Sequence, residues 1–280
     1  MRFFVEAKRP QPNIVTPDNC FQAIRYSWPK SLPITVLTDF NHLHIIDSRF
    51  RPNIDSAVTR CVRNWHCSEF ANRGTFEEIY WLLSREAVAK GNIDMFAEEH
   101  LPEQQVAARQ YSLFPGEARE FDDDFLQKLD GWRESLASVF KLANGALNGQ
   151  QLTESVQRTL DRLVFIRFLE DKNLEPDPLI IKWGLHKNDH WRDFINACKR
   201  LDQIYNGVVF KRHNIIDEPN FHPTGAAFAD ICTELTDNHS PYNFDSIPVE
   251  ILGRIYERFL GKVVQATQNA VEVVLERGCP

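Results

Sequence analysis

The first ten residues carry the pattern that most restricts the fold of this chain. Between Met1 and Pro10 the side chains alternate as they do in a β-strand, so that Phe4, Glu6 and Lys8 lie on one face. The prolines that follow end the strand, because proline cannot donate a backbone hydrogen bond. A carboxylate and an ammonium therefore leave the same face of a sheet two residues apart.

The next forty residues add a helix and a hairpin. Pro17 and Asp18 predict a helix start, with Asp18 as the N-cap. Within this helix Gln22 and Tyr26 are four residues apart and share a face. Two extended runs follow, separated by a turn at residues 39 to 41; they are Ile34–Thr38 and His42–Asp47. The predicted order is strand, helix, hairpin.

The Glu6 and Lys8 pair has the chemistry of a metal-dependent phosphodiester site. A carboxylate oxygen can hold a hard divalent cation. A nearby ammonium can orient water and neutralise charge that develops on a phosphate. Taken alone, such a pair also fits the solvated face of an ordinary strand, so both readings stay open on these two residues.

Three segments together give a specific resemblance. The segments are Phe3–Pro10, Gln22–Tyr26 and Pro33–Phe40. They resemble the nuclease domain of type IIG restriction-modification enzymes, which are a branch of the PD-(D/E)xK nucleases. Three later segments resemble the closing helix of that nuclease and the helical connector to an adenine-specific DNA methyltransferase; they are Phe76–Val88, Asp161–Asp171 and Ile251–Gly261.

The resemblance implies Mg²⁺-dependent hydrolysis of DNA. Glu6 would be the metal ligand and a catalytic residue, and Lys8 would orient or activate the attacking water. Gln22 would support the site as a third catalytic residue. The DNA backbone would be contacted by Arg9, Arg25 and Tyr26. These roles come from the family and not from spacing alone.

The sequence departs from the family at both ends. Members place an aspartate one strand before Glu-x-Lys as the second carboxylate on the metal, and this chain has no such strand before Arg2. The later acids Asp18, Asp39 and Asp47 have no evident route to Glu6. We therefore expect a fragment with a weak Mg²⁺ site and greatly reduced cleavage. With no Gly-x-Gly or Asn-Pro motif, S-adenosylmethionine is not expected to bind.

Periodicity divides the chain into a mixed part and a helical part. A short helix is expected around Val58, Val62 and Trp65, and a better-marked one begins at a capping box, Thr75 to Glu78. The fold class is α+β. We expect residues 1–95 to form an incomplete nuclease-like α/β domain, residues 96–121 a linker, and residues 122–280 an all-α connector. In the connector, Thr153 is expected to cap one helix, and further helices are expected near 190–205, 224–237 and 249–261.

Charge and composition indicate which ligands and which cellular compartment suit this chain. The net charge is −7, yet residues 1–73 hold ten Lys and Arg against six Asp and Glu. That local excess of positive charge suits a part of the chain that approaches phosphates. Its arginines also fit an ordinary solvated face. These arginines are Arg49, Arg51, Arg60, Arg63 and Arg73. No apolar run is long enough for a membrane span, which indicates a cytoplasmic protein. Cys61, His66 and Cys67 lack a fourth zinc ligand, so reduced thiols are expected.

Two further functions remain open. The chain could be a non-catalytic DNA-binding module, or a helical module that docks on a separately encoded methyltransferase through the helix from Leu252 to Gly261.

Overall fold

The computed structural model describes residues 2–101, 119–175, 179–185, 189–205 and 208–247, together with 250 and 253. Contacts between α-carbons divide the chain into two compact units. The first comprises Met1–Phe121 with Ser246–Pro248, and the second Asp122–Asp245 with Val249–Pro280. The expected helix over 249–261 lies outside the described residues except at two positions.

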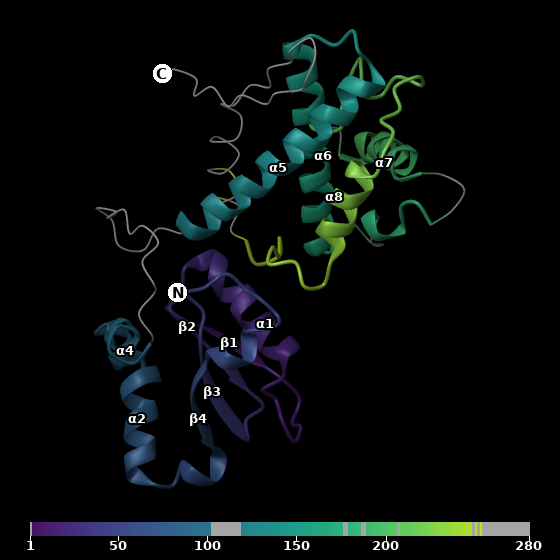
Figure 1. The fold of residues 1–280 in the computed structure, drawn as a ribbon. Coiled ribbons are helices and arrows are strands. Elements are labelled where there is room, and N and C mark those ends of the chain that lie inside the picture. The colour runs from purple at the N-terminus through teal and green to yellow at the C-terminus, as the bar shows by residue number, and fades with distance from the viewer. Residues whose placement is uncertain are drawn as a thin grey trace. The chain divides into compact units, whose positions relative to one another are not determined.

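The first unit is built on a four-stranded mixed sheet in the order β1-β2-β3-β4 (Figure 1). The strands are β1 (Phe4–Ala7), β2 (Ile34–Thr38), β3 (His42–Asp47) and β4 (Cys61–His66). β1 runs parallel to β2, with Glu6 opposite Leu37, whereas the other neighbours are antiparallel. The predicted bounds of the hairpin strands are confirmed, and so is the α+β class.

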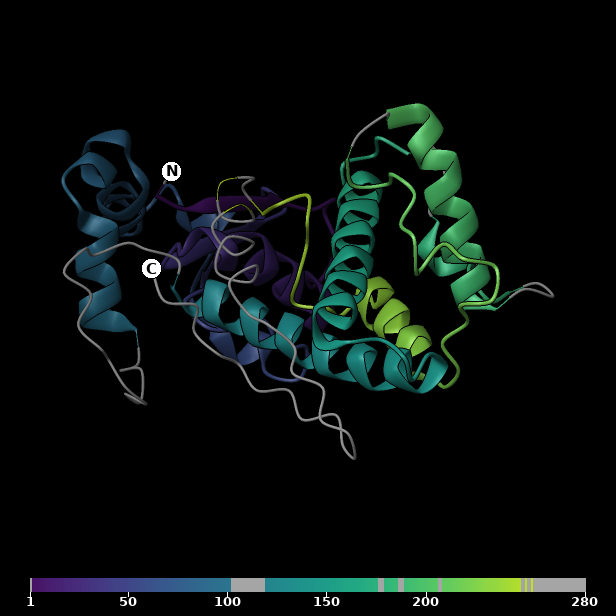
Figure 2. The same ribbon diagram turned by 90° about the horizontal axis from the view of Figure 1, so that it is seen from above.

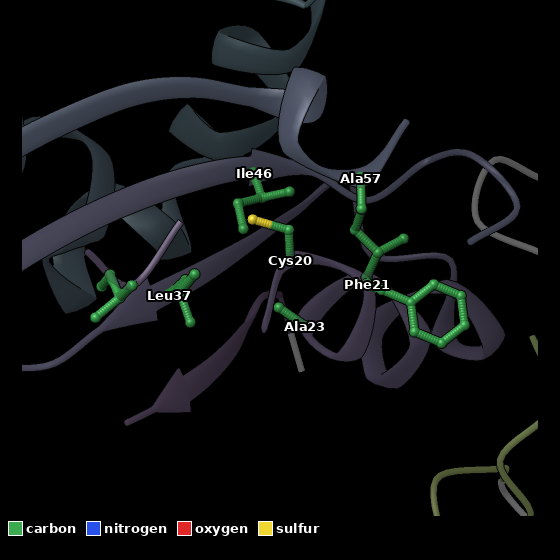
Figure 3. Packing of buried hydrophobic residues seen from close by; sticks show 8 residues of the cluster. Cys20, Phe21, Ala23, Leu37, Ile46 and Ala57 are labelled. Atoms are coloured by element: carbon green, nitrogen blue, oxygen red, sulfur yellow. The ribbon is translucent and has the colours of Figure 1, made fainter. Parts of the chain in front are cut away.

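One face of the sheet is covered by α1 (Pro17–Ser27), which makes the crossover between the two parallel strands. Its buried side chains pack on Leu37 and Ile46 from the sheet and on Ala57 (Figure 3). The predicted N-cap is wrong by two residues, since Thr16 accepts the hydrogen bond from the Asn19 amide. Pro17 then fills the first helical position, where its missing amide hydrogen costs nothing.

The other face packs against helices α2 (Arg73–Leu83), α3 (Arg85–Ala89) and α4 (Asn92–His100). Trp65 of β4 meets Leu82 and Phe96 in this core. The helix expected around Val58 to Trp65 is wrong: a 3₁₀ turn, η2 (Ala57–Arg60), leads into β4. The capping box at Thr75 is also wrong, because Asn72 caps α2 and the helix starts at Arg73.

In the described residues of the second unit, all regular secondary structure is helical (Figure 2). It holds α5 (Arg119–Ala143), α6 (Gly149–Asp171), η4 (Ile180–Lys182), α7 (His190–Tyr205) and α8 (Ala227–Thr236). Asn148 caps α6 in a capping box with Gln151, in place of the expected Thr153. Of the linker expected over 96–121, residues 96–100 belong to α4 and residues 119–121 to α5, and residues 102–118 lie outside the described part of the chain. None of the described helices is long and apolar enough to cross a membrane.

A buried ion pair holds α6 to the segment that follows α7. The Arg162 guanidinium, with a side chain 0% exposed, donates to both oxygens of Asp217 at 2.9 and 2.8 Å. It also donates to the carbonyl of Lys211 at 2.9 Å, and Asp217 accepts the backbone amide of His213 at 2.7 Å. Such a pair keeps its charges only because both partners are fully hydrogen-bonded.

We predict that Asp217→Ala lowers the free energy of unfolding of the helical unit by about 3 kcal/mol, because it leaves the Arg162 charge buried without its partner. Urea denaturation followed by the far-UV helical signal measures the change. Glu218→Ala is the matched control, since Glu218 pairs with Arg212 at the surface and should contribute less than about 1 kcal/mol. Equal effects of the two changes would contradict the assigned role of the buried pair.

A second prediction concerns pH. Burial raises the pKa of Asp161 to about 6. The hydrogen bond from Gln157 and the nearby charges of Arg158 and Arg133 lower this pKa, but burial has the larger effect. A raised folded-state pKa gives stability that is present at low pH and is lost as pH rises through about 6. Asp161→Asn should therefore gain stability relative to the wild type between about pH 4 and pH 6. Parallel stability curves for the two proteins would rule this out.

Candidate active site

Glu6 and Lys8 leave β1 on the face that α1 covers, as the alternation of the strand predicts. The Lys8 Nζ lies 2.9 Å from the Glu6 Oε1. The side chains are 13% exposed for Glu6 and 20% exposed for Lys8, so both are sheltered but reachable from solvent. This pair is more enclosed than a surface ion pair on an ordinary strand.

Gln22 on α1 completes a contact with Lys8. The Lys8 ammonium donates to the Gln22 Oε1 at 2.5 Å, and the Gln22 Nε2 donates to the Tyr26 hydroxyl at 3.3 Å. Glu6, Lys8, Gln22 and Tyr26 thus form one continuous chain of polar contacts between β1 and α1. The helix positions its two residues because its opposite side is buried against β2 and β3.

Two residues beside this chain of contacts were not identified from the sequence. The Phe4 and Tyr26 rings lie 5.4 Å apart, and the Lys30 Nζ lies 5.6 Å from the centre of the Phe4 ring. Lys30 also donates to the Tyr26 carbonyl at 3.3 Å. Lys30 follows Tyr26 by four residues, which is a spacing that places two side chains on one face of a helix. Pro29 argued against a helix that continues to Lys30, and the chain there forms a 3₁₀ turn (Trp28–Lys30).

The residues expected to contact DNA differ in exposure. Arg9 is exposed directly after Lys8, whereas Arg25 is half-buried in the last turn of α1. Tyr26 is half-buried and belongs to the chain of contacts that starts at Glu6. Arg9 is therefore the more accessible of the two guanidiniums to a ligand that approaches β1.

The later aspartates have other partners. Asp39 is fully buried and accepts hydrogen bonds from the amides of Asn41 and His42 at the β2–β3 turn. Asp47 is paired with Arg49, and Asp18 is exposed in the first turn of α1. Among the described residues no group of three or more His, Cys, Asp and Glu side chains is placed to hold a metal ion. Glu6 is the carboxylate that this site provides.

Removing the Gln22 amide should release Lys8. In Gln22→Leu the ammonium keeps only its contact with Glu6, so its side chain becomes more mobile and more accessible. We expect acetic anhydride to acetylate Lys8 faster in the folded variant than in the folded wild type. Mass spectrometry of the labelled proteins measures the extent of acetylation at Lys8. The exposed Lys199 is the internal reference, and its rate should not change. An unchanged Lys8 rate would show that the contact with Gln22 does not restrain it.

Comparisons with known proteins agree with the resemblance seen in the sequence. No protein-family model matches the chain, and no solved structure matches it. The type II restriction enzyme and methyltransferase RM.Eco57I of Escherichia coli is 29% identical over 268 residues, which cover 94% of this chain. The chain spans about a quarter of the length of that relative. Over almost all of its own length, this protein is therefore a homologue of a restriction enzyme that is also a methyltransferase, as the resemblance to type IIG restriction-modification proteins predicted.

Proposed function

We propose that this chain contributes the DNA-cleaving part of a restriction-modification protein, a Mg²⁺-dependent endonuclease that hydrolyses phosphodiester bonds. The observation that carries the proposal is the contact between Lys8, Glu6 and Gln22 at the junction of β1 and α1. Its support is the order of strand, crossover helix and parallel strand, together with the homologue named above.

The donor set of the site fits a Mg²⁺ ion that is only weakly held by protein. Mg²⁺ commonly enters through one or two carboxylates plus substrate phosphates, and Glu6 supplies one carboxylate. When bound, the ion would polarise the phosphate and lower the pKa of a water molecule. Because most of its ligands would come from water and DNA, we expect cleavage to need high Mg²⁺ concentrations.

The protein's own residues have distinct roles in this proposal. Lys8 orients the attacking water and neutralises the charge that develops on the phosphate. Gln22 holds the Lys8 ammonium in place, and Tyr26 fixes the amide of Gln22. Water adds across the phosphorus–oxygen bond, so the products are one hydroxyl end and one phosphate end.

The outer edge of β1 is the position from which a second carboxylate could join Glu6 in binding the metal ion. β1 is an end strand of the described sheet, and its outer edge pairs with no described strand. Proteins of the resembled family carry an aspartate on the strand before Glu-x-Lys. A strand with an acidic residue along this edge would lie next to Glu6 and would strengthen the hold on the metal ion.

The test is cleavage of supercoiled plasmid by the purified 280-residue chain with Mg²⁺. We expect slow nicking that Glu6→Gln abolishes and that Lys8→Met lowers by roughly 10²-fold. Glu98→Gln and Lys90→Met, at exposed positions, are the matched controls and should cleave like the wild type.

Nicking that survives in the Glu6→Gln protein would come from a contaminant or from another site, and would refute the proposal. DNA binding without any Mg²⁺-dependent nicking would favour the non-catalytic DNA-binding module instead.

A further inference from the structure

The segment between β3 and β4, residues 48–60, concentrates positive charge in a chain whose net charge is −7. It contains three arginines, Arg49, Arg51 and Arg60, against one acidic residue, Asp55. Two of the guanidiniums lie over the Phe50 ring, Arg60 at 3.9 Å and Arg49 at 5.5 Å from its centre. We refer to Arg49, Phe50 and Arg60 as the arginine–phenylalanine cluster.

The two arginines of this cluster differ in their partners. Arg49 is bound to Asp47, which is 1% exposed, through two hydrogen bonds of 2.9 Å. Arg60 forms no ion pair with any described residue, and its guanidinium stacks on the Phe50 ring. Stacking on an aromatic face orients a guanidinium but leaves its N–H donors available.

The segment is held firmly to the sheet and to α1. Ala57 is 1% exposed in the core with Cys20 and Phe21, and η2 packs against α1 (Figure 3). Ser48 is fully buried, and its hydroxyl donates to the Leu32 carbonyl at 2.7 Å. A guanidinium presented from such an anchored segment loses little conformational freedom when it binds a ligand.

The chemistry of the cluster fits a phosphate group. A guanidinium presents several donors in a planar fork that matches phosphate oxygens. Arg60 has its charge uncompensated within the described structure, while Phe50 restricts its orientation. Two guanidiniums lie over the Phe50 ring, which disfavours an apolar protein partner at this point.

We propose that the arginine–phenylalanine cluster binds the DNA phosphate backbone, with Arg60 as the contacting group and Phe50 as the residue that positions it. This inference rests on the proposed function for its ligand, and it adds a contact surface separate from the DNA contacts expected at Arg9, Arg25 and Tyr26. A backbone contact positions the duplex and carries no sequence information.

The experiment measures binding of the full chain to a short fluorescent DNA duplex by anisotropy, without Mg²⁺ and over a series of salt concentrations. Arg60→Gln should weaken binding and lower the slope of log affinity against log salt by about 0.9, the value for one lost phosphate contact. Arg60→Lys should restore the slope. Phe50→Leu keeps every charge and should weaken binding at all salt concentrations.

Arg73→Gln is the control for net charge, because Arg73 is 92% exposed and is paired with Glu77. Its slope should match the wild type. Equal slopes for Arg60→Gln and Arg73→Gln in folded proteins would overturn the inference, as would the absence of DNA binding. Wild-type affinity in Phe50→Leu would overturn the role of the ring.

The two proposals fail in different ways. If plasmid nicking depends on Glu6 but Arg60→Gln binds DNA like the wild type, the nuclease proposal stands and the cluster is not a phosphate contact. If binding depends on Arg60 and no nicking occurs, the cluster is a DNA contact and the nuclease proposal is wrong. Circular dichroism of each variant shows whether the fold is intact.

Discussion

The parallel pairing of β1 with β2 is the constraint on which the described site depends. Two adjacent parallel strands cannot be joined by a tight turn, so the chain must cross over one face of the sheet, and α1 makes that crossover. The buried side of α1 then fixes which of its residues face β1. Gln22 reaches Lys8 because the apolar side of the same helix is packed on Leu37 and Ile46. The polar site and the apolar core on this face are thus two consequences of one topology.

Much of this arrangement could be predicted because its signals are local. Alternation fixed the face of Glu6 and Lys8, and helical spacing placed Gln22 beside Tyr26; the structure adds the contact between the two pairs. β4 could not be recognised because Val58, Val62 and Trp65 have helical spacing. The register shift between β3 and β4 at Ile45 and Ile46 breaks the alternation that would have identified a strand. Cap positions were misplaced by two to five residues, since several neighbouring polar side chains can cap each helix.

Contacts between distant residues were beyond sequence reasoning. The arginines of the first unit suited either a phosphate-binding surface or a solvated face, and only the fold shows that Arg60 lies over the Phe50 ring. Lys30 reaches the Phe4 ring through a 3₁₀ turn that spacing does not reveal. In the helical unit the pairing of Arg162 with Asp217 joins residues 55 positions apart. Each of these contacts depends on packing between elements and not on the pattern within one element.

We propose that a divalent cation binds at Glu6, beside Lys8. Iron-directed cleavage of the protein backbone tests it most directly: Fe²⁺ replaces Mg²⁺, ascorbate and peroxide generate hydroxyl radicals at the bound ion, and mass spectrometry maps the cuts. We expect cuts in β1 around Glu6 and in the paired part of β2 around Leu37, and both excess Mg²⁺ and the Glu6→Gln substitution should suppress them. Cuts confined to other parts of the chain, or cuts near Glu6 that persist in Glu6→Gln, would contradict it.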